Sequence, residues 1–410
     1  MYYYKYNNKF LFSKVQIGEL DNATEDDLIS TKDTIYFLNS MNPFSSRRGF
    51  MVKSAAQIEA SQEGLEILQE NEGDHQLPSW IEDRIRDEKV KSVNISFPRW
   101  KEELDALPSH WRINVIALGD VGSTLLIGLR LLGSNMTIGI YDRSPDKVRR
   151  WVHELGQIRR PFQEKSFPTV EAVDKENLFD CDMVVFCASK GIPPVGSESV
   201  DVRMVQFEGN REILKEHGKT AREKGFKGIF AVVSDPVDLL CRGLYLDSNT
   251  DDEGNLDYMG LAPNQIIGYG LGVMNARACF HAERNPGLEH YFSEGQVFGP
   301  HGKGLIVADS MVNYNEENSL FLTDKALKSN LEIRGFGFKP YVAPSLSSGA
   351  LSLIATIENN YFYGSSMMGE VFMGAKMRLT SNGLDIPSYS LHPMLKDRLE
   401  KTYTELRSMI

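Results

Sequence analysis

Residues 113–142 read INVIALGDVGSTLLIGLRLLGSNMTIGIYD, and this stretch decides the fold. The apolar run from Ile113 to Leu118 is long enough for a buried strand and too short for a helix. After a tight turn, residues 123–132 carry apolar side chains at helical spacing, and Gly133 stands where a left-handed helix cap is expected. A second apolar run ends at Asp142. Strand, turn, helix and strand in this succession form one βαβ unit.

The turn of this unit carries a variant of G-x-G-x-x-G, the fingerprint of dinucleotide-binding turns, with Ala117, Gly119 and Gly122 at the three glycine positions. Gly119 lets the backbone approach a pyrophosphate, and Gly122 lets the helix pack close to the strand. The free N–H groups of the helix start, around Asp120 and Val121, are expected to hold the phosphates. Ala117 departs from the fingerprint, and it fits if its backbone angles are ordinary.

Asp142 ends the second strand twenty residues after Gly122, where a carboxylate accepts hydrogen bonds from a ribose diol. A 2′-phosphate would meet a like charge there, which favours NAD over NADP, although the neighbouring Arg143 weakens this preference. On these residues alone, a glycine-rich turn that binds nothing stays open as the alternative.

Composition excludes several classes of function. The chain has 410 residues, of which 41% are hydrophobic and 25% charged, as in an ordinary soluble protein of two or three domains. A net charge of −11 argues against nucleic acid or an anionic membrane surface as the partner. The four cysteines have no metal-ligand spacing, so no metal is expected. Without a signal peptide or a membrane-spanning run, a cytoplasmic location is expected.

Residues 1–110 contain no recognisable motif. Residues 2–15 and 34–38 are expected to form strands, and residues 55–72 an exposed acidic helix. Residues 42–49 form a polar turn with two cations that could meet an anion, and a solvated loop is the favoured interpretation. The segment could be a small α+β domain, a dimerisation arm or a cover for an active site.

From Trp111 onward, buried strands alternate with amphipathic helices. The runs 182–188 and 228–234 are expected to be strands, with a helix over 209–225 between them. This alternation predicts a Rossmann-type doubly wound parallel sheet, an α/β fold. Ligands of such sheets bind at the carboxyl ends of strands, which places Ala188 and Ser234 beside the turn at residue 118.

After residue 260 the pattern of expected strands and helices changes from regular alternation to mixed α+β. We therefore divide the chain into an N-terminal extension (1–110), an NAD-binding domain (111–260) and a mixed α+β catalytic domain (261–410). In the last, the sequence predicts strands near 295–299, 305–312 and 331–338, a helix over 347–362, an edge hairpin over 371–380 and a terminal helix over 392–410.

Three segments could carry chemistry. Residues 190–203 form a loop rich in glycine and proline, and Arg203 at its end could close over an anionic ligand. Arg277 lies one turn into a helix that opens at Gly270, and a guanidinium fork matches a planar carboxylate. His301 stands on a glycine-rich turn, and histidine titrates in the range that general acid–base catalysis needs. Each feature alone is ordinary for a surface residue.

Together these segments resemble the lactate/malate dehydrogenase family from about Ile113 to the C-terminus. The order of the motifs carries the resemblance: IALGDVGST for the cofactor turn, DMVVFCAS for a central strand, RMVQFEGNREIL for the helix after the active-site loop, VVSDPVDLL for V-S-N-P-V-D, IIGYGLGVMNAR for I-G-x-G-T-x-L-D-x-x-R and VFGPHGKG for G-x-H-G-x-S. The chain is identified as a divergent member with an extra N-terminal region.

The resemblance implies roles for individual residues. His301 falls on the family's catalytic acid–base, Arg277 on the arginine that binds the substrate carboxylate, and Arg203 on the loop arginine that polarises the carbonyl. The implied reaction is hydride transfer between NAD(H) and a 2-oxo or 2-hydroxy acid. The family also suggests a homo-oligomer, a dimer or tetramer.

The departures from the family pattern matter equally. Met274 replaces the aspartate that pairs with the catalytic histidine, and Asp235 replaces the asparagine of S-N-P. The loop before Arg203 is about four residues longer than usual and lacks the second arginine of malate enzymes. Without its aspartate the imidazolium loses its main stabiliser.

Two interpretations follow. In the favoured one, Asp235 has taken over as the carboxylate near His301, and the substrate is neither plain lactate nor plain malate. In the other, the fold has kept NAD but lost catalysis, which leaves a regulatory or assembly role. An enzyme requires a carboxylate within hydrogen-bond reach of His301, whereas a sensor requires an apolar or blocked pocket around Met274. A structural protein without a cofactor would have lost the glycines and Asp142.

Overall fold

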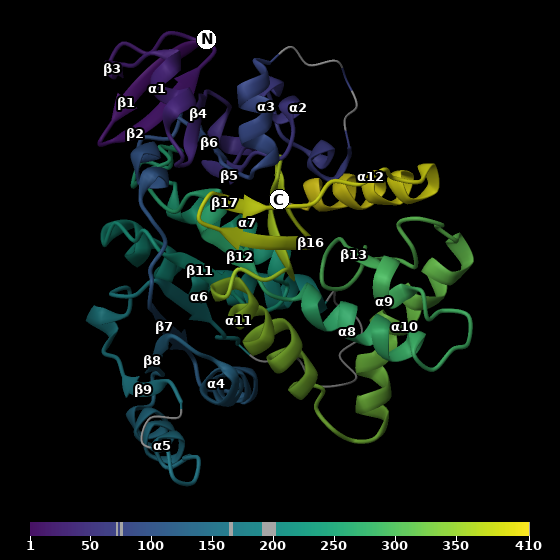
Figure 1. Ribbon diagram of the computed structural model, residues 1–410. Coiled ribbons are helices and arrows are strands. Elements are labelled where there is room, and N and C mark those ends of the chain that lie inside the picture. The colour runs from purple at the N-terminus through teal and green to yellow at the C-terminus, as the bar shows by residue number, and fades with distance from the viewer. Residues whose placement is uncertain (71–72, 74–76, 164–166, 191–201, 410) are drawn as a thin grey trace.

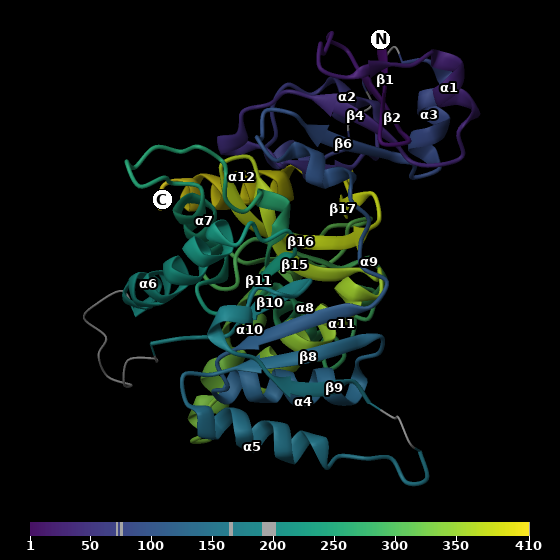
Figure 2. The same ribbon diagram turned by 90° about the vertical axis from the view of Figure 1, so that its left-hand side faces the viewer.

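The computed structural model describes the whole chain except residues 71–72, 74–76, 164–166, 191–201 and 410, and the side chains of residues 202–205. An N-terminal domain lies at one end of a larger body built on a nine-stranded sheet (Figures 1 and 2). The α/β fold with a parallel sheet and a mixed C-terminal part agrees with the fold class that the sequence predicts.

The N-terminal domain is a six-stranded mixed sheet in the order β3-β1-β2-β4-β6-β5. Asn7 and Asn8 both have positive φ, which gives the tight hairpin turn that joins the first two strands. Helices pack on the sheet, so the elements between Tyr2 and Asn94 have an α+β arrangement. These elements are β1 (Tyr2–Tyr6), β2 (Lys9–Ser13), β3 (Asp21–Asn22), α1 (Glu25–Ser30), β4 (Ile35–Asn39), β5 (Gly49–Met51), α2 (Ala55–Glu59), α3 (Ser79–Arg86) and β6 (Val90–Asn94).

The predicted exposed helix over residues 55–72 is wrong. The α-helix ends at Glu59, and a separate 3-10 turn forms over Leu65–Leu68. Leu65, Ile67 and Leu68 are buried in the main core, against the C-terminal helix. The acidic residues between them suggested an exposed face, but the turn directs all three apolar side chains inward.

The second body begins with the predicted βαβ unit. Its parallel strands run in the order β9-β8-β7-β10-β11-β12, which is the 3-2-1-4-5-6 order of a dinucleotide-binding sheet. The order in which the strands follow one another reverses between the parallel neighbours β7 and β10, and this is the position at which such sheets bind ligands. The elements are β7 (Trp111–Ile116), α4 (Asp120–Leu132), β8 (Met136–Tyr141), α5 (Pro145–Gly156), β9 (Thr169–Ala172), β10 (Met183–Phe186), α6 (Val202–Glu223), β11 (Ile229–Val232), α7 (Val237–Ser248) and β12 (Ile266–Gly268).

The cap of α4 differs from the prediction. Gly133 is extended, with φ −71° and ψ 152°, and its N–H donates to the carbonyl oxygen of Leu129. The left-handed residue is Asn135, with φ 50°, one position before the next strand. Gly133 is instead required for space, because a Cβ there would lie 2.6 Å from the Leu129 oxygen.

The C-terminal part adds antiparallel strands to the same sheet. β15 pairs with β12, so four strands after residue 260 belong to the nine-stranded sheet, and the sheet has no break at the predicted 260/261 boundary. The elements are α8 (Leu271–Ala282), α9 (Tyr291–Glu294), β13 (Gln296–Phe298), β14 (Ile306–Ala308), α10 (Glu316–Gly335), a π-helical turn (Pro344–Ala350), α11 (Leu351–Ile357), β15 (Phe362–Met368), β16 (Val371–Thr380), β17 (Gly383–Asp385) and α12 (Pro393–Arg407).

Three predictions for this part need correction. Residues 331–335 are helical, because α10 continues from its Asn315 cap through Gly335. The helix predicted over 347–362 starts earlier, with the π-helical turn, and ends at Ile357. β16 is paired on both sides, with β15 and β17, and is therefore not at an edge. The terminal helix is present as α12.

Candidate active site

The turn after β7 has the shape of a phosphate cradle, with one strained residue. Ala117 has φ +73°, so the expectation of ordinary backbone angles is wrong. Glycine adopts this left-handed conformation freely, whereas alanine pays about 1–2 kcal/mol. Gly119 is open, since a Cβ there would meet no heavy atom within 4 Å. A Cβ at Gly122 would collide with the carbonyl oxygen of Ala117, so the close packing of α4 depends on this glycine.

This geometry fits a dinucleotide. Gly119 caps α4 without any side-chain hydrogen bond, which leaves the first N–H groups of the helix, from Asp120 and Val121 onward, available to phosphate oxygens. Beneath the turn, Cys187 lies 3.3 Å from the Cβ position of Gly122, and burial raises the pKa of its thiol to about 12. The Cys187 thiol beneath the phosphate-binding turn is therefore uncharged.

Asp142 closes the same turn from the adjacent strand. Its Oδ2 accepts from the N–H of Leu118 at 2.8 Å and its Oδ1 from the N–H of Ser144 at 2.9 Å. Each carboxylate oxygen has a second lone pair, so a ribose diol can still bind. Lys147 lies 3.7 Å from Oδ2. The sequence pointed to the carboxylate, but its bond to the cofactor turn was not foreseen.

Hydrogen bonds connect the segments that follow β10 and β11. The Ser234 hydroxyl, at the end of β11, donates to the carbonyl oxygen of Ala188 at 2.7 Å. Asn210, 1% exposed on α6, accepts from the N–H of Lys190 at 2.9 Å and donates to the carbonyl oxygen of Asp235 at 2.7 Å. Asn210 lies in the quoted helix motif, where nothing in its spacing singled it out.

His301 and Asp235 lie together although 66 positions separate them in the sequence. His301 Nδ1 is 2.8 Å from Asp235 Oδ1. A carboxylate only accepts, so Nδ1 carries the hydrogen and Nε2 is the nitrogen that can exchange a proton with a ligand. His301 has a side chain that is 11% exposed, whereas Asp235 is 52% exposed. The carboxylate thus reaches the imidazole from the solvent side.

The turn of His301 is held in place from several sides. Asp238, 5% exposed on α7, accepts from the N–H of His301 at 3.2 Å and from the Ser365 hydroxyl at 2.8 Å. A Cβ at Gly270 would lie 2.9 Å from the Cβ of His301, so the start of α8 touches the turn directly. The hydroxyl of Ser348, in the π-helical turn, donates to the carbonyl oxygen of Gly270 at 2.7 Å. Sequence reasoning missed Asp238 and Ser348.

Arg277 is a buried cation with neutral partners. It is 8% exposed, and its guanidinium donates to the carbonyl oxygen of Ala326 at 3.4 Å and to the side-chain oxygen of Asn330. Within the described part of the chain it makes no ion pair with a carboxylate. Burial lowers the pKa of Arg277, and Asp235 opposes this through its charge. A buried guanidinium in this situation gains from an anionic ligand.

Met274 is buried on the same helix, in an apolar cluster, and its sulfur lies 3.5 Å from Arg277 Nη1. Both features that separated the two interpretations are therefore present: an apolar surrounding at Met274 and a carboxylate at His301. Arg203 is the second residue of α6, but its side chain lies outside the described residues, as do residues 191–201 of the loop before it.

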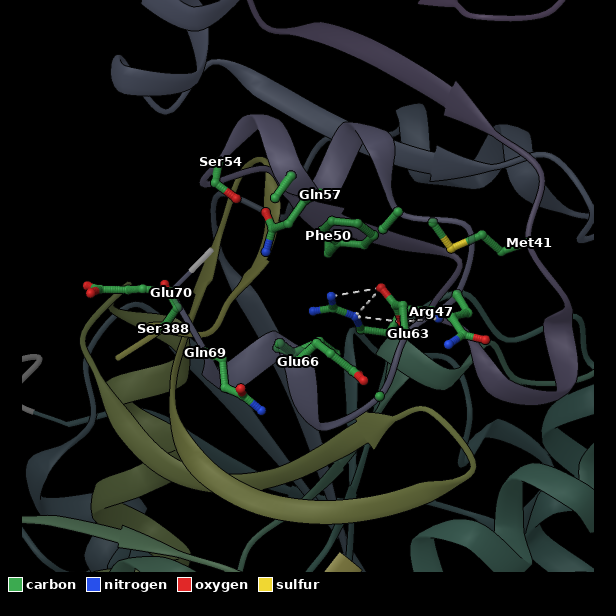
Figure 3. A pocket seen from close by; sticks show the side chains of 15 residues that line it. Met41, Arg47, Phe50, Ser54, Gln57, Glu63, Glu66, Gln69, Glu70 and Ser388 are labelled. Carbon is green, nitrogen blue, oxygen red and sulfur yellow. Dashed lines mark hydrogen bonds and ion pairs between the residues drawn. The ribbon is translucent and has the colours of Figure 1, made fainter. Parts of the chain in front are cut away.

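The two cations of residues 42–49 are not in a solvated loop. Arg47 is 3% exposed and forms a bidentate pair with Glu63, with Nη2 to Oε1 at 2.8 Å. The pair lies at the side of a cavity of about 340 Å³ between the N-terminal domain and Ser388 (Figure 3). Arg48, equally buried, pairs with Glu102 and Glu103. Both arginines therefore form ion pairs with glutamates of the same chain.

The same loop joins the N-terminal domain to α7. Arg242 Nη1 donates to the carbonyl oxygen of Phe44 at 3.0 Å and stacks on its ring, and the Tyr245 hydroxyl donates to the carbonyl oxygen of Pro43 at 2.6 Å. Asp238, at the start of α7, holds His301. The N-terminal domain therefore supports the back of the helix that positions the histidine turn.

Comparison with known proteins identifies the second body. Residues 111–256 match the model of the lactate/malate dehydrogenase NAD binding domain. L-lactate dehydrogenase 2 of Staphylococcus aureus strain JH9 is 28% identical over 204 residues, which cover 49% of this chain, and the same figures hold for strain Newman. These matches support the assignment of residues 111–256 to the NAD binding domain of the lactate/malate dehydrogenase family. The match of this chain spans 58% of the length of these lactate dehydrogenases.

Solved structures of the family share the fold. A lactate dehydrogenase from a Medee basin deep-sea metagenome library has a TM-score of 0.59 at 19% identity, covering 73% of this chain and 98% of its own. Malate dehydrogenase from Archaeoglobus fulgidus in complex with NADH has a TM-score of 0.58 at 17% identity, covering 72% of this chain and 97% of its own. The match of residues 111–256 to an NAD binding domain supports NAD as the cofactor.

Outside the excluded segments, no three histidine, cysteine, aspartate or glutamate side chains gather as a metal site requires. No described helix combines the length and apolar character that crossing a bilayer demands.

Proposed function

We propose that this protein is an NAD-dependent oxidoreductase that interconverts a 2-oxo acid and a 2-hydroxy acid. The hydrogen bond between Asp235 and His301 carries this proposal, because it restores the carboxylate that the Met274 replacement removes. A paired carboxylate fixes the tautomer of the imidazole and stabilises the imidazolium. Decay of an unused site gives no reason for a new carboxylate at this one position.

Each residue of the site has a separate role in the proposed reaction. NADH, when bound at the turn of residues 117–122, supplies the hydride that reaches the carbonyl carbon of the acid. His301, as imidazolium, gives its Nε2 proton to the carbonyl oxygen, and Asp235 stabilises the positive charge before the transfer. In the opposite direction the neutral imidazole removes the hydroxyl proton. Arg203 would polarise the carbonyl from the start of α6.

Arg277 supplies the binding charge. A carboxylate on the substrate would replace the missing counter-ion of this buried guanidinium and could accept two parallel hydrogen bonds. The neutral partners Ala326 and Asn330 hold the guanidinium without neutralising it. This arrangement supports a small-molecule acid as the substrate, and the altered surroundings support one that differs from lactate and malate.

A second candidate function rests on Met274. Its apolar, buried setting at the family's aspartate position also suits an NAD-binding protein that has lost catalysis and serves a regulatory or assembly role. The two candidates make the same prediction for NAD binding and opposite predictions for turnover, so activity separates them.

The experiment begins with melting temperature in the presence of NAD, NADH, NADP or NADPH. A ligand at one hundred times its Kd stabilises the folded state by about 2.7 kcal/mol, and we expect NADH to do so more than NADPH. NADH oxidation is then measured with a panel of 2-oxo acids. Turnover by wild type that is lost in His301→Asn and reduced about a hundredfold in Asp235→Asn supports the enzyme. Stabilisation by NADH without turnover of any acid supports the second candidate.

We also propose a homo-oligomer in the cytoplasm. Large apolar side chains are exposed along α10 and the loop that follows, at Leu331, Phe336, Phe338 and Val342. Exposed apolar side chains of this kind suit contact with a second copy of the chain. Light scattering should give a dimer or tetramer in wild type and a smaller species after Phe336→Ser with Phe338→Ser.

A further inference from the structure

An ion pair joins the cofactor turn to a distant loop. Lys339 lies between α10 and the π-helical turn, and its Nζ is 3.0 Å from Oδ2 of Asp120. Asp120 is the first residue of α4. Lys339 therefore reaches from the C-terminal part to the residue at which the phosphate cradle begins.

Asp120 carries the wrong charge for this position. The N-terminus of α4 offers N–H groups and a partial positive charge to a pyrophosphate. A carboxylate on the first residue competes for the same groups and repels the incoming anion. Repulsion between charges a few ångströms apart near a protein surface weakens binding by about ten- to hundredfold. The turn therefore needs a cation at Asp120 to bind a dinucleotide well.

We propose that Lys339 determines the affinity for the cofactor by neutralising Asp120. This inference rests on the proposed use of NAD at this turn and adds a residue from outside the NAD-binding domain. The lysine holds the carboxylate to one side, so the phosphates meet the helix N-terminus without a net negative neighbour. Binding of the cofactor then depends on the position of the loop that carries Lys339.

The pair is well suited to substitution. The side chain of Lys339 is 80% exposed and that of Asp120 is 52% exposed, so neither packs in the core. Replacing either residue should leave the melting temperature of the cofactor-free protein unchanged. Lys328 provides a matched control, because it forms an exposed pair with Asp324 on α10, at 2.6 Å.

The test measures the Kd of NADH by fluorescence for wild type, Lys339→Ala, Asp120→Asn, the double variant, Lys339→Arg and Lys328→Ala. We expect Lys339→Ala to weaken binding about tenfold at low salt, and less at high salt. The double variant should return to within about threefold of wild type, because the charge that needed neutralising is gone. Lys339→Arg and Lys328→Ala should bind as wild type does.

Adenosine serves as a second probe, since it lacks phosphate. Its affinity should be the same in wild type and Lys339→Ala, which separates a charge effect at the phosphates from damage to the site. An unchanged Kd for NADH in Lys339→Ala would overturn the inference. A loss that Asp120→Asn does not rescue would also overturn it, because Lys339 would then act directly on the cofactor. Failure of wild type to bind NADH would instead defeat the proposed function and this inference with it.

Discussion

Arg48 and Arg277 are both buried arginines, and they differ in what neutralises them. Arg48 is enclosed by carboxylates, with Nη1 3.0 Å from Glu102 and Nε 2.8 Å from Glu103. Lys91 completes that network by pairing with Glu103 at 2.9 Å. Arg277, in contrast, is held by a carbonyl, an amide and a thioether, and makes no ion pair within the described residues.

The difference distinguishes a structural cation from one that awaits a ligand. A buried charge costs free energy unless it is paired, so a fold keeps an uncompensated guanidinium only where something compensates it in use. The Arg48 network joins the N-terminal domain to the turn before β12, where Asn264 also donates to Glu103 at 2.9 Å. Arg277 lies within range of the charge of Asp235, which pairs with His301, and the substrate is expected at this site.

The largest expected effect is on stability, at Arg48. Arg48→Met leaves Glu102 and Glu103 without their shared cation, which should cost about 3–5 kcal/mol in the free energy of unfolding. Urea denaturation followed by circular dichroism measures this. Arg86→Met, which breaks an exposed pair with Asp83 in the same domain, is the control and should change little. Equal stability of the two variants would contradict the claim that Arg48 is a structural cation.

The next effect is on activity, at Arg277. Arg277→Met should lower kcat/KM for the 2-oxo acid about 10²- to 10³-fold, equivalent to about 3–4 kcal/mol, because the substrate carboxylate loses its counter-ion. Stability should be equal to or above that of wild type, since an uncompensated buried charge is gone. If the variant instead unfolds as readily as Arg48→Met, Arg277 is structural and the distinction fails.

A smaller effect should appear with pH. Burial alone would raise the pKa of Glu103, but Lys91 and Arg48 overcome it and hold the pKa well below its usual range. A carboxyl with a lowered pKa in the folded state stabilises the fold above its unfolded pKa, near 4.3, and this contribution is lost as pH falls below that value. The unfolding free energy should thus drop by about 1.5 kcal/mol between pH 5 and pH 3. A flat profile over this range would contradict the proposed network.

The smallest effect concerns Ala117. Ala117→Gly relieves about 1–2 kcal/mol of left-handed strain, and the greater freedom of glycine in the unfolded chain offsets about 0.4–1 kcal/mol of it. A net gain of up to about 1.5 kcal/mol should raise the melting temperature by a few degrees. Gly128→Ala, whose Cβ would lie 2.5 Å from Ala350, should lower it instead. A lower melting temperature for Ala117→Gly would mean that the turn is not strained.

The sequence predicts the cofactor region better than any other part. The βαβ unit, the doubly wound parallel sheet and the position of Asp142 follow from local patterns of apolar residues and glycines, which act over a few residues. The proximity of Asp235 to His301 could be proposed because motif order placed both at strand ends. Asp238 and Ser348 could not be found in this way, because their contacts join elements far apart in the chain and leave no local signal.

The N-terminal domain shows the opposite situation. Arg47 and Arg48 looked like solvated cations because their partners, Glu63 and Glu103, are distant in sequence and surrounded by other acidic residues. A charged residue has no periodicity that reveals whether it is buried. The same reasoning explains the wrong helix over residues 55–72, where charge density was taken as exposure although three apolar residues face the core.

Transfer of deuterium is the most direct test of catalysis by the Asp235 and His301 pair. Wild type is incubated with NADH deuterated at the reactive carbon and with each 2-oxo acid, and the 2-hydroxy acid is examined by mass spectrometry. We predict one deuterium at carbon 2 of a product, formed by wild type and absent with His301→Asn. Binding of NADH without any labelled product would contradict the enzyme and leave an NAD-binding protein.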